Sequence, residues 1–462
     1  MGLAAAAALL PAWASPGETA AGKGEPSISL TLIPPSPVTE QVAIEIRCAV
    51  WNKGELADTF DVSFFLDRCE PGSAIYHERV QVGPGTAQGV FFRWPARGRA
   101  GKHRIIVEAD SPTETRRFER VLEVIASDDR SSGQLGGAWV DIYHFSEVEG
   151  KYFNAELGKM TEKDWRKLVR AMRDIKMNVL VNTMLFQNFT HYGEHDIEQK
   201  GYQGKAFYPS GLFPGRMPIA CEDPLEAMLS EADKHGMHVF PGIGPYAFFD
   251  FTPGSLAWHE AVAEEVWRRY GHHPSFYGWY VSDEIAGDLG NDPVRWRQIV
   301  DFFREFRATC RRLAPDKPVM LATNSHFVSR AVEAYRQLLP HLDILCPFGF
   351  HRMPEGDVTG EEAAQLLQKL CDESGCHLWM DLETFVVHMG GALYPRPVAG
   401  VISDLRRFPG FEKTLCYQYP GLMNAPWASR KPGGPPTVEL YRDYADYLKK
   451  GVPKLDANSR RP

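Results

Sequence analysis

Apolar and polar positions alternate in short runs from residue 26 to about residue 127, and no helical period interrupts them. The runs cover residues 27–32, 42–51, 60–66, 89–94, 103–109 and 117–122. Alternation with a period of two, broken by turn signals such as Asn52-Lys53-Gly54, is typical of half-buried strands. The pattern predicts an all-β, immunoglobulin-like sandwich of six or seven strands over residues 26–127.

The pattern changes after the polar linker at residues 127–133, where short apolar strands begin to alternate with amphipathic helices. The predicted strands are 137–143, 178–182, 238–243, 276–281, 319–323, 344–348, 377–382 and 413–418. The predicted helices are 162–175, 224–235, 256–270, 293–313, 329–339, 361–373, 398–407 and 438–449. Eight such units without a Gly-rich phosphate loop favour an α/β fold of the TIM (β/α)8 type over an open sheet, so we assign residues 134–455 to a barrel.

The composition adds limits to this picture. The chain has 462 residues with 51 basic and 59 acidic side chains and no basic tract, which gives no reason to expect a nucleic-acid partner. Apart from the N-terminus, no apolar run approaches the length of about 18 residues that a membrane span needs. The eight cysteines lack the C-x-x-C spacing of zinc or redox motifs, and Cys48 and Cys69 are candidates for a bridge. No cofactor is predicted, and the oligomeric state is left open.

Residues 1–15 are rich in alanine and leucine and end in Ala12-Trp13-Ala14, with small residues where a signal peptidase cleaves. We interpret them as a signal peptide, which predicts a secreted or periplasmic protein. No Lys or Arg precedes the apolar run, so a disordered tail is the other interpretation.

Two predicted barrel strands end at carboxylates. The fourth strand leads to Asp283 and Glu284, and the seventh leads to Asp381 and Glu383. Barrel strands end at the catalytic face, and strands 4 and 7 lie across the lumen from one another. Hydrolysis of a glycosidic bond needs one neutral acid and one anion, which different environments can produce from two similar carboxyl groups. Glu284, beside aromatic residues, is the expected acid.

This placement resembles the clan A glycoside hydrolases, in architecture and in the two carboxylates. The resemblance implies a retaining mechanism, with Glu284 as acid/base and Glu383 as the nucleophile that forms a covalent glycosyl-enzyme. The chain departs from the clan pattern because Asp283 stands where an Asn usually binds the sugar. If Asp283 and Glu284 alternate faces, as adjacent residues of a regular strand do, only one of them faces the lumen. Asp381 shares its parity with Glu383 and is expected to be a supporting hydrogen-bond acceptor.

The other strand tips carry side chains that suit sugars, since aromatic faces stack on pyranose rings and amide or imidazole groups bind hydroxyls. The predicted substrate-binding residues, besides Asp283 and Asp381, are Trp139, Asn182, Tyr246, Asn324, His351 and Tyr417. Phe348 and Trp379 are expected to pack inside the barrel. Loops at residues 201–218 and 247–253 are expected to build a cleft for an oligo- or polysaccharide.

In residues 26–127, the order Trp51-Asn52-Lys53-Gly54, then Phe60 to Asp67, then Gly101 to Val107, resembles the CARDB-type immunoglobulin-like modules of bacterial surface and secreted proteins. This resemblance implies an accessory or spacer module.

Two other functions stay open. One is a non-catalytic glycan-binding protein on a degenerate barrel. The other is a metal-dependent barrel hydrolase that uses Asp141, His144, His326, His351 and Asp381, although the chain has neither a His-x-His after the first strand nor an H-E-x-x-H. We therefore predict no metal.

Overall fold

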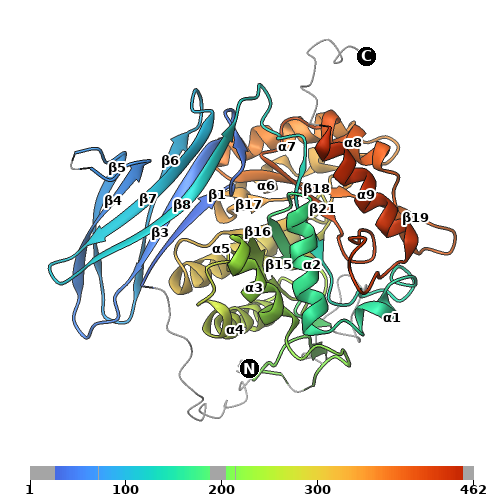
Figure 1. Cartoon of the computed structure of the whole chain (residues 1–462), viewed down its shortest axis with the longest axis horizontal. Coiled ribbons are helices and arrows are strands. Elements are labelled where there is room, and N and C mark those ends of the chain that lie inside the picture. Colours follow the sequence, from blue (N-terminus) through green and yellow to red (C-terminus); the bar gives the residue numbers. More distant parts are fainter. Residues whose placement is uncertain (1–26, 71, 188–203, 214, 451–462) are drawn as a thin grey trace, which may run out of the picture.

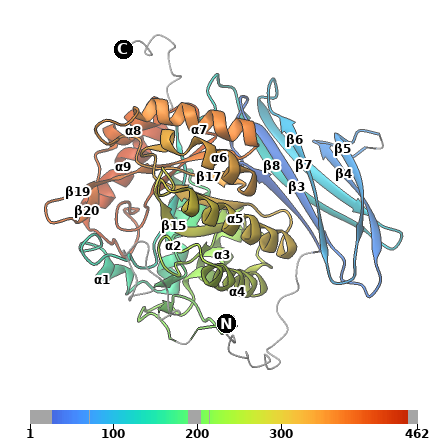
Figure 2. The same ribbon diagram turned by 180° about the vertical axis from the view of Figure 1, so that it is seen from behind.

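The computed structural model describes residues 27–450, except residue 71, residues 188–203 and residue 214. The predicted signal peptide and part of the predicted loop at 201–218 lie outside the described residues. A β-sandwich lies on one side of the molecule and an α/β barrel on the other (Figure 1). Figure 2 shows the same arrangement from behind, with α4, α5 and α7 on the outside of the barrel.

The sandwich consists of two sheets, in the strand orders β1-β3-β6 and β2-β8-β7-β4-β5. Its strands are β1 (Ile28–Ile33), β2 (Val38–Thr39), β3 (Ala43–Trp51), β4 (Asp58–Leu66), β5 (Tyr76–Val82), β6 (Ala87–Pro95), β7 (Gly101–Asp110) and β8 (Thr115–Ile125). Inward-facing residues of both sheets, including Ile46, Phe64 and Val107, form one apolar core. The prediction of an all-β N-terminal domain is thus supported. The six predicted runs correspond to β1, β3, β4, β6, β7 and β8, and the structure adds β2 and β5.

Eight parallel strand positions form the barrel. They are β9 (Leu135–Val140), β10 (Val179–Asn182), β13 (His238–Phe240) with β14 (Gly242–Ile243), β15 (Trp279–Ile285), β16 (Val319–Thr323), β17 (Ile344–Leu345), β18 (His377–Glu383) and β21 (Lys413–Tyr417). The sheet begins at β13 and ends at β14. Because only Pro241 separates these two pieces of one segment, and β13 pairs with β10 while β14 pairs with β15, the sheet closes on itself. The predicted barrel is therefore present.

Helices alternate with the barrel strands along the chain. They are α1 (Asn154–Leu157), α2 (Glu162–Asp174), α3 (Pro224–His235), α4 (Pro253–Tyr270), α5 (Pro293–Leu313), α6 (Val332–Leu338), α7 (Gly360–Ser374), α8 (Val398–Arg407) and α9 (Pro435–Lys449), with 3-10 turns η1 (Val328–Arg330) and η2 (Leu339–His341). Two short hairpins, β11 (Phe186–Gln187) with β12 (Lys205–Ala206) and β19 (Phe385–Val387) with β20 (Leu393–Pro395), lie in the loops. No described helix is long and apolar enough to cross a bilayer.

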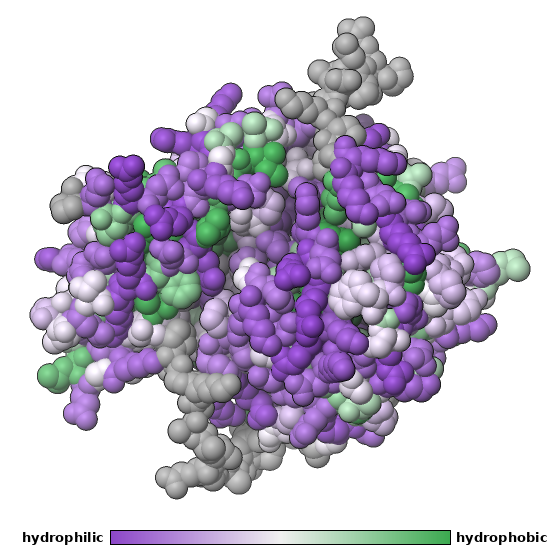
Figure 3. Space-filling model, in the orientation of Figure 1, coloured by the Kyte–Doolittle hydropathy of each residue, from purple (hydrophilic) through white to green (hydrophobic). Residues whose placement is uncertain are grey.

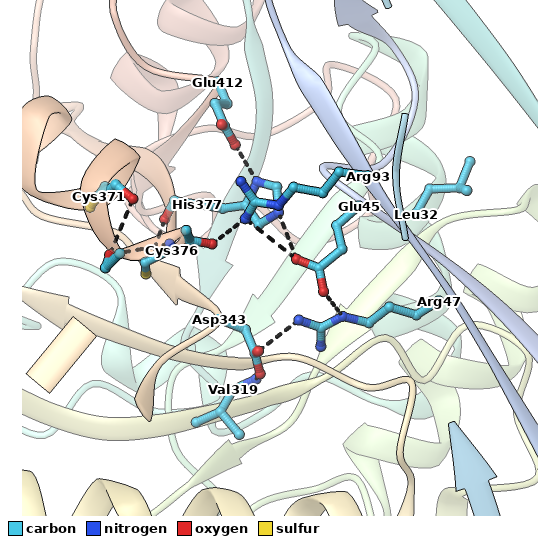
Figure 4. Close-up of polar contacts among 12 residues, drawn as sticks. Leu32, Glu45, Arg47, Arg93, Val319, Asp343, Cys371, Cys376, His377 and Glu412 are labelled. Atoms are coloured by element: carbon cyan, nitrogen blue, oxygen red, sulfur yellow. Dashed lines mark hydrogen bonds and ion pairs between the residues drawn. The ribbon is translucent and has the colours of Figure 1, made fainter. Parts of the chain in front are cut away.

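The sandwich packs against the N-terminal ends of the barrel strands through buried charged groups (Figure 4). Arg47 of β3 donates to Asp343, just before β17, at 2.7 Å, and also to Glu45 at 2.6 Å. The Nδ1 atom of His377, at the start of β18, lies 2.6 Å from Glu412, and its Nε2 atom lies 3.5 Å from Glu45. The sandwich therefore closes the end of the barrel opposite to the carboxyl ends of the strands.

The bridge considered between Cys48 and Cys69 is not formed. All eight cysteines lie in the described part of the chain, and all are free. Cys48 is buried in the sandwich core, and the Cys69 thiol instead lies 3.5 Å from Glu108. The face of the molecule in Figure 3 is mainly hydrophilic, with small hydrophobic patches among the hydrophilic residues.

Candidate active site

A cavity of about 380 Å³ opens where the barrel strands end. Each of the eight strand positions, or the loop after it, contributes to the lining: Trp139, Phe145, Glu149, Thr183, Met184, Phe248, Tyr280, Ser282, Asp283, Glu284, Ala322, Phe348, Arg352, Asp381, Glu383, Phe385, Val387, Leu393 and Tyr417. Aromatic and apolar walls thus surround a small group of carboxylates, as in ligand sites generally. Because this face is the usual active-site face of such barrels, the cavity is the candidate site.

Glu383, the last residue of β18, is 3% exposed and has a cationic partner. Its Oε1 accepts hydrogen bonds from Nε and Nη2 of Arg352, at 2.8 and 2.6 Å. Its Oε2 lies 3.1 Å from Nδ1 of His351. The positive charge of Arg352 therefore balances the negative charge of Glu383 and contacts its Oε1 atom. The Oε2 atom instead lies beside the imidazole of His351.

Glu284 lies across the barrel on β15, where its side chain is exposed to the cavity. Burial by the surrounding barrel atoms raises its pKa, and the negative charges of Glu149 and Glu383 add to this increase, while Arg352 opposes it. A raised pKa favours the protonated carboxyl group. Glu284 and Glu383 therefore have different electrostatic environments at one cavity.

Asp283, next to Glu284, also lines the cavity, so the alternation of faces that would have placed only one of the two in the lumen is not present here. The register of β15 against β16 shifts between Val281 and Ile285, and strict alternation does not hold across this irregularity. The Asp283 carboxylate accepts the backbone N–H of Phe249 at 3.1 Å, and burial raises its pKa well above the usual range.

Two further buried carboxyl groups lie near the candidate pair. Burial, together with the charges of Glu383 and Glu284, raises the pKa of Asp381 well above its usual range. Asp141, after β9, accepts the hydroxyl hydrogen of Tyr417 at 3.1 Å, and burial raises its pKa to about 7. Asp141 therefore positions the Tyr417 side chain that lines the cavity.

The other predicted substrate-binding residues divide into two groups. Trp139 and Tyr417 line the cavity, and His351 is not a lining residue but contacts the lining residue Glu383. The second group, Asn182, Asn324 and Tyr246, is not among the lining residues. The Asn182 amide donates to the carbonyl oxygen of Val140 (3.2 Å), and the Asn324 amide oxygen accepts the backbone N–H of Gly287 (2.7 Å). The centroid of the Tyr246 ring lies 5.6 Å from that of Trp258.

Several lining residues were not predicted as site residues. Arg352 directly follows the predicted site residue His351 in the loop after β17, but its contact with Glu383 is a tertiary contact that the sequence does not show. Glu149 lies in the long loop after β9, where no periodicity indicates which side chains face the barrel. Phe348, expected to be packing, lines the cavity, whereas Trp379 is buried in the barrel interior as predicted.

The five residues proposed for a metal centre do not form one ligand cluster among the residues described. In the part of the chain that the structure describes, the group with ligand atoms close enough to hold an ion is Glu226 of α3 with His272 and His273, which follow α4. His273 lies 3.0 Å from Glu226 and 2.6 Å from Asp233, and these carboxylates outweigh its burial and raise its pKa to about 9. The contacts fit a protonated histidine between two carboxylates.

Residues 135–430 match the family described as a domain of unknown function, DUF4434. The chain belongs to this family. Its barrel therefore carries the family's defining region, and the cavity lies within this DUF4434 region.

Curated relatives of this DUF4434 protein include the beta-glucuronidases of Pongo abelii and Homo sapiens, 30% and 28% identical over 124 residues. Each match covers 26% of this chain and 17% of the relative, so the chain matches less than a fifth of these proteins' length. Among solved structures, one described as a "putative alpha-L-fucosidase" from Bacteroides thetaiotaomicron has a TM-score of 0.52 at 17% identity, covering 69% of this chain and 95% of that chain. The sequence relatives are glycoside hydrolases, and the structural likeness concerns the fold alone.

Proposed function

We propose that this DUF4434 protein is a glycoside hydrolase, with Glu284 as acid/base and Glu383 as nucleophile of a retaining mechanism. One observation carries the proposal. Two carboxylates from the fourth and seventh strand positions line one cavity, where Arg352 compensates the charge of one and burial raises the pKa of the other. Such a difference suits one anion and one acid.

In the first step, Glu284 gives its proton to the glycosidic oxygen while a carboxylate oxygen of Glu383 attacks the anomeric carbon. Arg352 holds Oε1 and His351 lies beside Oε2, so these two side chains orient the Glu383 carboxylate. The leaving group departs as an alcohol and a glycosyl ester remains. In the second step, Glu284 takes a proton from water, whose oxygen replaces Glu383 at the anomeric carbon.

Variants at the two positions test these roles against aryl glycosides of neutral and acidic sugars. We expect Glu383→Gly to lose activity by about 10³-fold or more and to regain turnover with added azide, which replaces the missing nucleophile. We expect Glu284→Gln to lose roughly 10²- to 10⁴-fold with poor leaving groups, but much less with 2,4-dinitrophenyl glycosides, whose departure needs no acid. Glu355→Gln, an exposed carboxylate outside the cavity, is the matched control.

The stereochemistry of the first product, followed by NMR, tests retention. An inverted product would require a water between the carboxylates and would remove Glu383 as nucleophile. If the wild-type protein and Glu284→Gln bind glycan equally and neither releases product, the protein is a glycan-binding barrel and the enzyme proposal is wrong.

The curated relatives make a glucuronide one class of substrate to test. A secreted or periplasmic location and the CARDB-like character of the sandwich stay predictions. Export of a fusion carrying residues 1–15 would test the former.

A further inference from the structure

We propose that the sugar bound in the cavity is uncharged, and that uronides are poor substrates. This inference rests on the proposed function and concerns the same site. It comes from the charges around the cavity. The described lining residues include five carboxyl groups, Glu149, Asp283, Glu284, Asp381 and Glu383, and one cation, Arg352. Burial raises the pKa of Asp283, Glu284 and Asp381 and favours their protonated forms, which leaves Glu149 and Glu383 to carry the negative charge.

The one cation is already engaged. Two nitrogen atoms of Arg352 bind the same oxygen of Glu383, at 2.8 and 2.6 Å, so this positive charge is compensated by a carboxylate of the protein. A sugar carboxylate could bind Arg352 only by sharing this cation with Glu383, and the site would then hold two anions for one cation.

The nearby histidines add no positive charge at neutral pH. Burial lowers the pKa of His144, beside Glu149, to about 4. Burial also lowers the pKa of His351, beside Glu383. Both imidazoles are therefore neutral where a glycosidase of this kind would work.

The carboxylates already repel one another, as the effect of Glu149 and Glu383 on Glu284 shows. A sugar carboxylate would bring a further negative charge close to Glu149 and Glu383, and like charges at close range oppose binding. An uncharged ring meets no such repulsion and can stack on the partly exposed aromatic side chains of the lining, which include Phe145, Phe385 and Tyr417.

Matched substrate pairs test the proposal: the 4-nitrophenyl glucoside against the glucuronide, and the galactoside against the galacturonide, each as both anomers. We expect kcat/KM to favour the neutral member of any cleaved pair by about 100-fold or more. Preferential cleavage of a uronide would overturn the inference while leaving the proposed function intact.

Binding gives a second measurement that does not depend on turnover. 1-Deoxynojirimycin and its galacto isomer carry a hydroxymethyl group, and their analogues with a carboxylate at this carbon are the matched probes. We expect the hydroxymethyl compounds to raise the melting temperature of the wild-type protein and the carboxylates not to do so. Tighter binding of a carboxylate, or no binding of either class at 10 mM, would overturn the inference. Binding of the neutral class without any cleavage would instead sink only the proposed function.

Glu149 offers a matched pair of variants, because Glu147 lies in the same loop but bonds to Tyr143 (2.6 Å) and is not a lining residue. We expect Glu149→Gln to raise uronide kcat/KM relative to its neutral partner about 3- to 10-fold, since one repelling charge is removed. The alkaline limb of the pH profile should also move to lower pH, because Glu149 helps to raise the pKa of Glu284. Glu147→Gln should change neither quantity. An unchanged ratio in Glu149→Gln would contradict the charge argument.

Discussion

At the scale of one residue, the buried carboxyl group of Asp141 makes the stability of the fold depend on pH. Its pKa of about 7 lies well above that of a solvated aspartate, because the buried side chain is poorly solvated as an anion. The stability contributed by the protonated form is complete below the unfolded pKa near 4. This contribution to the free energy of unfolding is lost as pH rises through about 7, and it amounts to roughly 4 kcal/mol.

We therefore expect Asp141→Asn to remove much of the fall in unfolding free energy between pH 4 and pH 7.5. Urea unfolding at several pH values measures this difference. Asp443→Asn, an exposed position on α9, is the control. Parallel pH curves for the wild-type protein and Asp141→Asn would mean that Asp141 does not titrate in this range.

The sequence allows some site residues to be predicted for a physical reason. Glu284, Asp381, Glu383 and Tyr417 are at the ends of apolar runs, and the end of a parallel strand fixes where a side chain lies. Asn182 and Asn324 have the same signal but bind backbone groups, because polar residues at strand ends also satisfy the chain. Loop residues such as Arg352 carry no periodic signal and need tertiary structure.

At the scale of elements, strands and helices with strong patterns were predicted closely. The segment β16 and the helices α3, α5 and α8 have the predicted bounds. The hairpin of β19 and β20 was missed, because two three-residue strands are too short for a pattern to show. It projects from the barrel in Figure 1 and contributes Val387 and Leu393 to the cavity.

The β19 strand offers a test of whether this hairpin contacts the ligand. Val387 is 65% exposed and lines the cavity, whereas the neighbouring Val386 is 40% exposed and is not a lining residue. We expect Val387→Asp to weaken binding of 1-deoxynojirimycin or an aryl glycoside about 10-fold, through lost apolar contact and added negative charge. Val386→Asp should leave the dissociation constant within about twofold. Equal effects of the two substitutions on the dissociation constant would show that Val387 does not contact the ligand and that both substitutions act by disturbing the hairpin.

At the scale of the whole molecule, the buried charges between sandwich and barrel make stability depend on pH. Burial opposes the charge of His377, but Glu412 and Glu45 outweigh it and raise the pKa of His377 to about 9. The stability from protonated His377 is complete below the unfolded pKa of about 6.5. It is lost as pH rises through about 9, and it amounts to roughly 3 kcal/mol.

We expect His377→Gln to lower the unfolding free energy at pH 6.5 much more than at pH 9.5. Urea unfolding at pH 6.5, 8 and 9.5 measures this dependence, and His77→Gln, an exposed sandwich histidine, is the control. A loss that is the same at all three pH values would assign His377 a packing role instead.

The contact of Arg47 with Asp343 also has an evolutionary consequence. The Oδ1 atom of Asp343, which accepts from Arg47, also forms ion pairs with Arg307 and Arg311 of α5. Its Oδ2 atom accepts the backbone N–H of Val319, the first residue of β16. A buried partner that is removed leaves unbalanced charge behind. We therefore expect a recombination point between residues 127 and 134 to be costly, because it would combine one of these buried charged surfaces with a part that lacks its partners.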